Sequence, residues 1–138
     1  MKKYHIILGI IQAFTALGAI PAAYGYLSDT SGAGMGTSTE LLAKSPFDSF
    51  LIPGLFLLVV NGFGNAIGAF LSFRMMALAG KAGIVLGIIL CFWIILQVYW
   101  IGLGSLLQPF FFIVGIAEAW LGWYILKHSL VLSQKPLQ

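Results

Sequence analysis

The sequence has very little charge. Only 8% of its 138 residues are Asp, Glu, Lys or Arg, whereas 60% are hydrophobic. A soluble domain typically carries about 25% charged residues, so this chain has too few polar side chains to cover a surface in contact with water. The shortage excludes the soluble classes and predicts an integral membrane protein.

Cysteine and histidine are also scarce. The single cysteine, Cys91, excludes a disulfide framework or CxxC chemistry within one chain, and its apolar surroundings are typical of a small hydrophobic side chain. The two histidines, His5 and His128, lie at the ends of apolar runs, where histidine is usually an interfacial residue. No catalytic triad, paired carboxylates or metal-ligand spacing is present. We therefore expect no metal and no cofactor, and we do not expect an enzyme.

The chain has long apolar runs instead. Each is close to the roughly 20 residues that a membrane-spanning helix needs, and we expect transmembrane helices over residues 4–25, 50–73, 82–101 and 109–127. The first run follows two lysines and is similar to a secretory signal peptide, but it is longer than a usual signal core. The predicted fold class is all-α: an antiparallel four-helix bundle forming one transmembrane domain over residues 1–138.

A polar loop over residues 26–49 separates the first two spans. Its stretch SGAGMG lacks the ending of a phosphate-binding loop and is typical of a flexible linker. Thr37 and Glu40 have the spacing of a capping box, which predicts a short helix in the loop. Ser45, followed by Pro46, predicts the start of the second membrane helix. Pro53 then predicts a bend early in that helix.

The basic residues indicate an orientation. With four spans, one side of the membrane receives Lys2, Lys3, Arg74, Lys81, Lys127 and Lys135, and the other receives only Lys44, beside Asp29, Glu40 and Asp48. Cytoplasmic loops carry the excess of Lys and Arg. We therefore expect both termini in the cytoplasm and the long loop outside. The basic residues are too scattered to predict nucleic-acid binding.

Small and polar residues recur along one face of each predicted helix. Such faces pack against other helices in a membrane, because small residues permit close approach and amides form interhelical hydrogen bonds. Gln12, Asn61, Asn65 and Glu118 come out near the same depth when the spans are antiparallel. We expect these four residues to form a polar cluster inside the bundle. Gln97 lies on such a face nearer the outer surface.

Glu118 is the acidic residue near the middle of the last apolar run, residues 110–127. A charge at that depth costs roughly 2.5 kcal/mol or more. No cation of the sequence lies at the same depth, so we expect the neutral, protonated acid, hydrogen-bonded to an amide. Glu118 then either fixes the packing of the helices or forms a site for a proton, a lipophilic cation or a polar head group.

Two resemblances bear on this chain. The stretch SPFDSFLIPGLFLLVVNGFGN is similar to small four-helix proteins of bacterial membranes, which implies a bacterial inner membrane and no particular activity. Four spans with a membrane glutamate also resemble the small multidrug resistance transporters. Their glutamate lies in the first span and Glu118 lies in the fourth, so their function is not carried over.

Two functions follow as hypotheses. The first is a non-enzymatic membrane module that binds a partner protein or a lipid through residues 41–50 and the bundle surface. The alternative is a protein that binds or transports a small molecule or protons with Glu118, Asn61 and Asn65. Four spans rarely enclose a pore alone, so the alternative predicts a homodimer.

Overall fold

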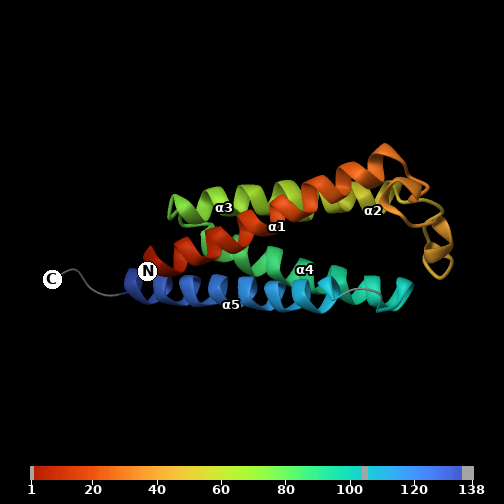
Figure 1. The fold of residues 1–138 in the computed structure, drawn as a ribbon. Helices are drawn as coiled ribbons and strands as arrows, with labels where there is room; N and C mark the ends of the chain where they lie inside the picture. The colour runs from red at the N-terminus through yellow and green to blue at the C-terminus, as the bar shows by residue number, and fades with distance from the viewer. Residues whose placement is uncertain (1, 104–105, 135–138) are drawn as a thin grey trace.

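A computed structural model describes residues 2–103 and 106–134 of the protein. Within these residues the chain forms four long helical rods that run antiparallel, with no β-strand (Figure 1). The rods are α1 (Lys2–Ser28), a composite rod of α2 (Leu51–Phe56), η3 (Leu57–Gly64) and α3 (Asn65–Phe73), then α4 (Ala79–Ile101) and α5 (Leu107–Gln134). All four rods are long and apolar enough to cross a membrane.

The composite rod is not a uniform α-helix. Its middle section, η3, is a π-helix of eight residues, LLVVNGFG, flanked by α-helix on both sides. Pro53 lies in the first turn of α2, where a backbone N–H has no partner within a helix in any case. The irregularity of this rod therefore lies one turn beyond the predicted bend. Pro21 does not end α1, which continues to Ser28.

The polar loop between α1 and α2 contains two short 3₁₀ turns, η1 (Ala33–Met35) and η2 (Thr39–Leu42). Ser38, one residue after the predicted cap, accepts a hydrogen bond from the Glu40 N–H at 3.2 Å. The predicted helix start at Ser45 is wrong. The Ser45 hydroxyl accepts a bond from the Phe47 N–H at 3.2 Å within a turn, and the helix begins only at Leu51.

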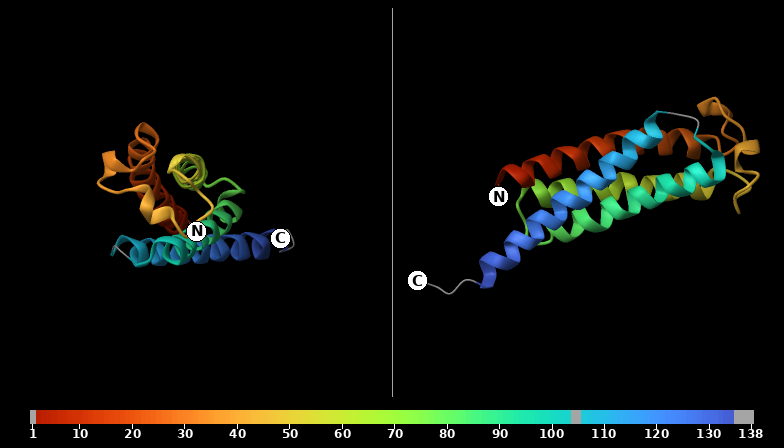
Figure 2. Two further views of the ribbon diagram at one scale, coloured as in Figure 1. Left: turned by 90° about the vertical axis from the view of Figure 1, so that its right-hand side faces the viewer. Right: turned by 90° about the horizontal axis from the view of Figure 1, so that it is seen from below.

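The rods form two pairs. α4 and α5 pack against each other along most of their length, and α1 packs against η3 and α3 (Figure 2). The N-terminus and the end of α5 lie at one end of the molecule, here called the termini end (Figure 1). The loop between α1 and α2 lies at the opposite end, the loop end. The two pairs approach each other near the termini end and diverge toward the loop end.

Glycines bring α4 and α5 into backbone contact. A Cβ atom on Gly87 would lie 2.5 Å from the Gly115 carbonyl oxygen and 2.5 Å from the Ala119 nitrogen. One on Gly122 would lie 2.6 Å from the Gly80 carbonyl oxygen. No side chain fits at these distances. The pair therefore has the close, small-residue packing by which helices associate in lipid, where the hydrophobic effect does not hold them together.

The turn between α3 and α4 is short and closes with paired backbone bonds. The Met76 N–H donates to the Leu71 carbonyl and the Met75 N–H donates to the Ser72 carbonyl, both at 3.0 Å. This is the Schellman pattern, which normally places glycine in the left-handed conformation. Met75 occupies that position with φ of 49°. The turn sets the composite rod antiparallel to α4 at the termini end.

Candidate functional site

Buried polar side chains of the bundle gather in two regions. The first, called the polar junction, consists of Gln12, Ser72 and Glu118, and each of these side chains is 0% exposed. The second is a cavity at the loop end that contains Asn61. The two regions differ in how their polar atoms are satisfied, and this difference decides which of them can accept a ligand.

The polar junction joins three rods through one amide. The Ser72 hydroxyl of α3 donates to Gln12 Oε1 at 2.7 Å. Gln12 Nε2 of α1 donates to Glu118 Oε1 of α5 at 3.3 Å. Because the hydroxyl donates to one end of the amide, the NH₂ group at the other end faces the carboxyl. The junction thus links the two pairs of rods by a directed chain of hydrogen bonds.

Glycine makes room for this chain. A Cβ atom on Gly68 would lie 2.7 Å from Gln12 Nε2. The glutamine therefore crosses the face of α3 where α3 has no side chain. On the neighbouring pair, a Cβ on Gly83 would lie 3.3 Å from the Glu118 carbonyl oxygen. The junction is closed on both sides by close-packed backbone.

One oxygen of Glu118 remains without a partner. Oε1 accepts the bond from Gln12, whereas Oε2 is buried with no hydrogen bond among the described residues. Among the described residues, no Lys or Arg forms an ion pair with it. A carboxyl in this position can hold a proton on Oε2 while Oε1 keeps accepting from the amide.

The loop-end cavity has a volume of about 790 Å³, within the range of small-molecule sites in proteins, roughly 300–1,000 Å³. All four rods and the loop contribute to it. None of the described residues that line it carries a charge. Its polar lining is Thr15, Tyr26, Thr37, Asn61, Gln97 and Gln108, and the remaining lining is apolar or glycine.

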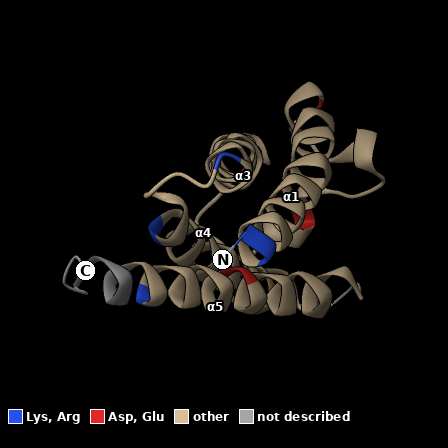
Figure 3. Ribbon diagram, turned by 90° about the vertical axis from the view of Figure 1, so that its left-hand side faces the viewer, with Lys and Arg blue, Asp and Glu red and all other residues tan. Residues whose placement is uncertain are grey.

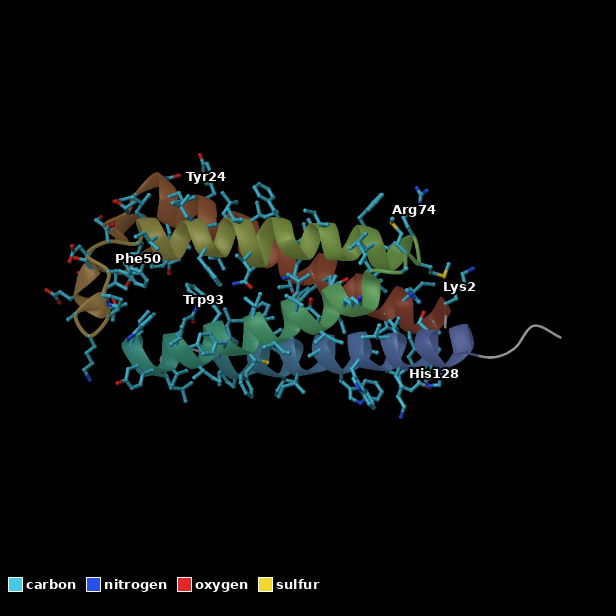
Figure 4. The ribbon with its side chains drawn as sticks, turned by 180° about the vertical axis from the view of Figure 1, so that it is seen from behind. Lys2, Tyr24, Phe50, Arg74, Trp93 and His128 are labelled. Atoms are coloured by element: carbon cyan, nitrogen blue, oxygen red, sulfur yellow. The ribbon has the colours of Figure 1, made fainter. Side chains whose placement is uncertain are left out.

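Aromatic rings form much of the cavity wall. Tyr26 stacks on Phe50 with centroids 4.8 Å apart, Phe56 stacks behind Trp93 at 4.7 Å, and Phe47 meets Trp100 edge-on at 5.6 Å. Phe50 comes from the loop and Trp93 comes from α4, and both lie toward the loop end (Figure 4). The rings of Phe47 and Phe50 belong to the loop, so the loop covers the cavity. Leu42 and Phe50 are 4% and 5% exposed, which indicates that this part of the loop packs inward.

Asn61 is the only lining side chain that is both fully buried and wholly unpaired among the residues described. It lies in the π-helix, is 1% exposed, and neither Oδ1 nor Nδ2 has a hydrogen-bond partner. A buried amide without partners costs roughly 1–3 kcal/mol. π-Helical segments inside longer helices are frequent at functional sites because they re-aim side chains. Asn61 is therefore the first candidate for contact with a ligand.

Three other buried polar side chains, those of Asn65, Thr15 and Gln108, have donors that are already in use. The Asn65 Nδ2 donates to the Asn61 main-chain carbonyl at 3.0 Å. The Thr15 hydroxyl donates to the Ile11 carbonyl at 2.9 Å, and the Gln108 Nε2 donates to the Gly102 carbonyl at 3.3 Å. These side chains are anchored to backbone. Asn61 differs because its amide keeps both its donors and its acceptor.

The structure places the predicted site residues in two groups. Gln12 and Glu118 are hydrogen-bonded to each other, whereas Asn61 and Gln97 line the cavity. Asn65 is fully buried but contributes to neither the hydrogen-bond chain of the junction nor the cavity wall. A role for these residues in ligand binding stays a prediction. Ser72 was missed as a partner of Gln12, although it shares the small-residue face of Asn65 and Gly68 in the sequence.

Comparison with family models, with curated proteins and with solved structures finds no match to this chain.

Proposed function

We propose that the protein is a non-enzymatic membrane module that binds a lipid-like ligand in the loop-end cavity. The observation that carries the proposal is the combination of an aromatic-lined cavity of about 790 Å³ with a buried, unpaired amide on a π-helix. Ligand sites are mostly apolar and contain a small number of placed polar groups that orient the ligand. The loop-end cavity has this composition.

The proposed setting is a bacterial cell membrane with both termini in the cytoplasm. Basic side chains gather toward the termini end (Figure 3), where α1 begins with Lys2 and Lys3 and Arg74 follows α3. The loop with Asp29, Glu40 and Asp48 lies at the other end. This charge distribution supports the orientation through the excess of Lys and Arg on cytoplasmic segments. Lys135 lies outside the described residues. In this orientation the cavity lies in the outer half of the membrane.

The inward packing of the loop supports a ligand over a protein partner at residues 41–50. Leu42 and Phe50 turn their side chains toward the bundle, and Phe47 meets Trp100 of α4. A docking segment for another protein would present such anchors outward. The loop is better described as a lid on the cavity.

Native mass spectrometry tests the proposal. The protein is extracted from its membrane in nanodiscs, and lipid-sized mass retained on the released protein is measured. Ala22 lines the cavity, so Ala22→Trp should fill it and lower the retained mass severalfold. Ala66 is exposed on the outside of the composite rod, and Ala66→Trp is the matched control that should retain the ligand. Equal retention in both variants, or no retention by the wild type, would refute the proposal.

The unpaired Oε2 of Glu118 favours a second candidate, a proton-coupled binding or transport protein. This function would need a homodimer, because four spans rarely enclose a pore alone. Within one bundle, Glu118 is fully buried and does not line the cavity. The test is the pH dependence of ligand or cation binding, together with the oligomeric state in detergent. Proton coupling predicts pH-dependent binding that Glu118→Gln abolishes. Unchanged binding and an unchanged fold in that variant would leave Glu118 with a structural role.

A further inference from the structure

Asn61 carries two complementary hydrogen-bonding atoms beside the loop-end cavity, and a rotation of its side chain would present them to a ligand. Its Oδ1 and Nδ2 are both unpaired, 1% of the residue is exposed, and the residue lines the loop-end cavity. We propose that the cavity selects single-chain amphiphiles whose head group is uncharged and both donates and accepts a hydrogen bond, as a hydroxyl or a primary amide does. Asn61 is the residue that determines this selectivity. The inference rests on the proposed function and specifies its ligand.

The lining excludes charged head groups. No Asp, Glu, Lys or Arg is among the described residues around the cavity. Transferring an ionised carboxylate or ammonium group into such surroundings costs several kcal/mol unless an opposite charge meets it. Glu118 does not supply that charge, because it lies in the polar junction and its one bonded oxygen faces Gln12. Fatty acids and quaternary ammonium compounds should therefore bind more weakly than neutral amphiphiles.

Pairing of the amide requires a head group with two functions. An amide oxygen accepts hydrogen bonds and an amide NH₂ donates them. An ether or ketone accepts from Nδ2 but leaves Oδ1 unpaired. A hydroxyl or a primary amide pairs with both atoms, which removes both unpaired groups of Asn61. Leaving a buried polar group unpaired costs more free energy than a hydrogen bond gains. A ligand that leaves Oδ1 of Asn61 unpaired should therefore bind more weakly than an otherwise similar ligand that pairs with both atoms.

The rest of the cavity suits an alkyl or isoprenoid chain. Leu57, Leu90 and Ile94 line it beside the rings of Trp93 and Trp100. These groups offer apolar contact without directional constraint, so they contribute affinity for the chain and little selectivity for the head. The head-group preference therefore depends on Asn61, while chain binding depends on the apolar wall.

Two tryptophans in the wall provide a reporter. The chain has four tryptophans, of which Trp93 and Trp100 line the cavity and Trp120 and Trp123 are about half exposed on the bundle surface. Replacing Trp120 and Trp123 by Phe confines the fluorescence to the cavity. The probes are chain-brominated amphiphiles of one length in nanodiscs, because bromine quenches tryptophan at contact. Four heads are compared: primary alcohol, methyl ether, carboxylate and quaternary ammonium.

The alcohol should quench at the lowest concentration. The methyl ether should need between about twofold and tenfold more, the range expected for one net hydrogen bond, and the two charged probes should need more still. Asn61→Leu should remove the difference between alcohol and ether while the chain still quenches. Asn65→Ala is the matched control, since it removes a neighbouring buried amide outside the cavity wall, and should keep the preference. A short-chain alcohol in water should not quench, which separates a membrane amphiphile from a soluble ligand.

Three other quenching results would each contradict the proposal in a different way. Equal quenching by all four heads would overturn the head-group inference and leave the proposed function intact. Quenching by none of the probes would overturn the proposed function itself. A preference for alcohol that survives in Asn61→Leu would remove Asn61 as its cause. The folding of every variant is checked by circular dichroism and size-exclusion chromatography in the same detergent.

Discussion

Two buried amides of the bundle differ in their hydrogen bonding: one is fully paired and the other is unpaired. At the termini end, Gln12 uses its oxygen for Ser72 and its nitrogen for Glu118. Asn61, which lines the loop-end cavity from the middle of the composite rod, is equally buried and uses neither. In the same region, a cavity separates the two pairs of rods and the composite rod is a π-helix. A paired amide fixes helix register. An unpaired amide destabilises the ligand-free protein, and a bound ligand that pairs with it removes that destabilisation.

Different parts of this small protein therefore provide its stability and its proposed ligand binding. Backbone contact between α4 and α5 and the polar junction hold the rods together, so the other end of the two pairs can diverge without loss of the fold. Regions that bind ligands are commonly among the less well packed parts of a protein. Substitutions in the tightly packed region and at Asn61 should therefore change the free energy of unfolding in opposite directions.

The largest effect is expected in the α4–α5 contact. Gly87→Ala places a methyl group 2.5 Å from main-chain atoms of α5, which cannot move independently of their helix. We expect a loss of about 3 kcal/mol in the free energy of unfolding, at the upper end of the usual overpacking effect. Unfolding is followed by circular dichroism as denaturing detergent is added to mixed micelles.

The matched control for this substitution is Gly18→Ala in α1. A Cβ atom there meets only the Phe111 ring, at an ordinary 3.6 Å. The change should be neutral or stabilising by up to about 1 kcal/mol, because alanine favours helix over glycine. Equal destabilisation by both variants would mean that the α4–α5 contact is not packed more tightly than the surroundings of Gly18.

The next effect is expected in the polar junction. Gln12→Leu removes the only hydrogen bond of the Glu118 carboxyl and the acceptor of the Ser72 hydroxyl among the described residues. Two buried groups lose their partner, and we expect a destabilisation of about 2 kcal/mol. Glu118→Gln should change stability by less than about 1 kcal/mol, because its amide oxygen still accepts from Gln12.

A double-mutant cycle measures the interaction between Gln12 and Glu118 separately from the effect of each single substitution. If Gln12 and Glu118 stabilise each other, Gln12→Leu combined with Glu118→Leu should be less destabilising than the sum of the two single changes. Strict additivity would show that the 3.3 Å contact contributes nothing to stability, and that Gln12 is in effect as unpaired as Asn61.

At Asn61 a substitution should increase the free energy of unfolding instead of lowering it. Asn61→Leu replaces an amide without partners by an apolar side chain of the same branching, so the ligand-free protein should become more stable by about 1 kcal/mol. Removal of a structural amide would have the opposite effect. Asn65→Leu, which breaks the bond to the Asn61 carbonyl, should destabilise and serves as the control. A stability loss in Asn61→Leu equal to that in Gln12→Leu would show that the two ends are alike.

The sequence predicts the helices far better than the cavity. The apolar run predicted over residues 50–73 corresponds to the rod Leu51–Phe73, because the length of an apolar run is a property of the sequence alone. Nothing in LLVVNGFG distinguishes a π-helix from an α-helix, since the apolar character is the same in both. The partners of Gln12 and the isolation of Asn61 depend on how the rods diverge. That divergence depends on contacts between residues that are distant in the sequence, such as the hydrogen bond from Gln12 to Glu118 that joins the two pairs.

The helix start predicted at Ser45 shows how a local pattern loses to tertiary contacts. The sequence there has a cap residue and proline at the first helical position, which favour a helix. In the structure the Phe50 N–H donates to the Thr30 carbonyl at 2.9 Å, and its ring stacks on Tyr26. These contacts hold residues 46–50 against the end of α1 as part of the lid. A helix from Ser45 would remove the lid from the cavity.

The smallest effect is expected in the lid, where pH provides the perturbation. The Ser31 hydroxyl and N–H donate to Asp29 Oδ1 at 2.6 and 3.1 Å, and the hydroxyl bond first, then the backbone bond, lower the pKa of this exposed carboxyl. A lowered pKa in the folded loop means that the contribution of Asp29 is complete above the unfolded pKa, about 4, and is lost as the pH falls through the lower folded value. Hydrogen exchange of the loop amides should therefore accelerate on acidification below about pH 4 relative to the chemical rate, and Asp29→Asn should weaken that dependence.

Amides of α4 beside Gly87, in the α4–α5 contact, should keep their protection over the same range. If they lose it together with the loop, the lid and the tightly packed region open as one unit, and the two ends of the bundle are not independent.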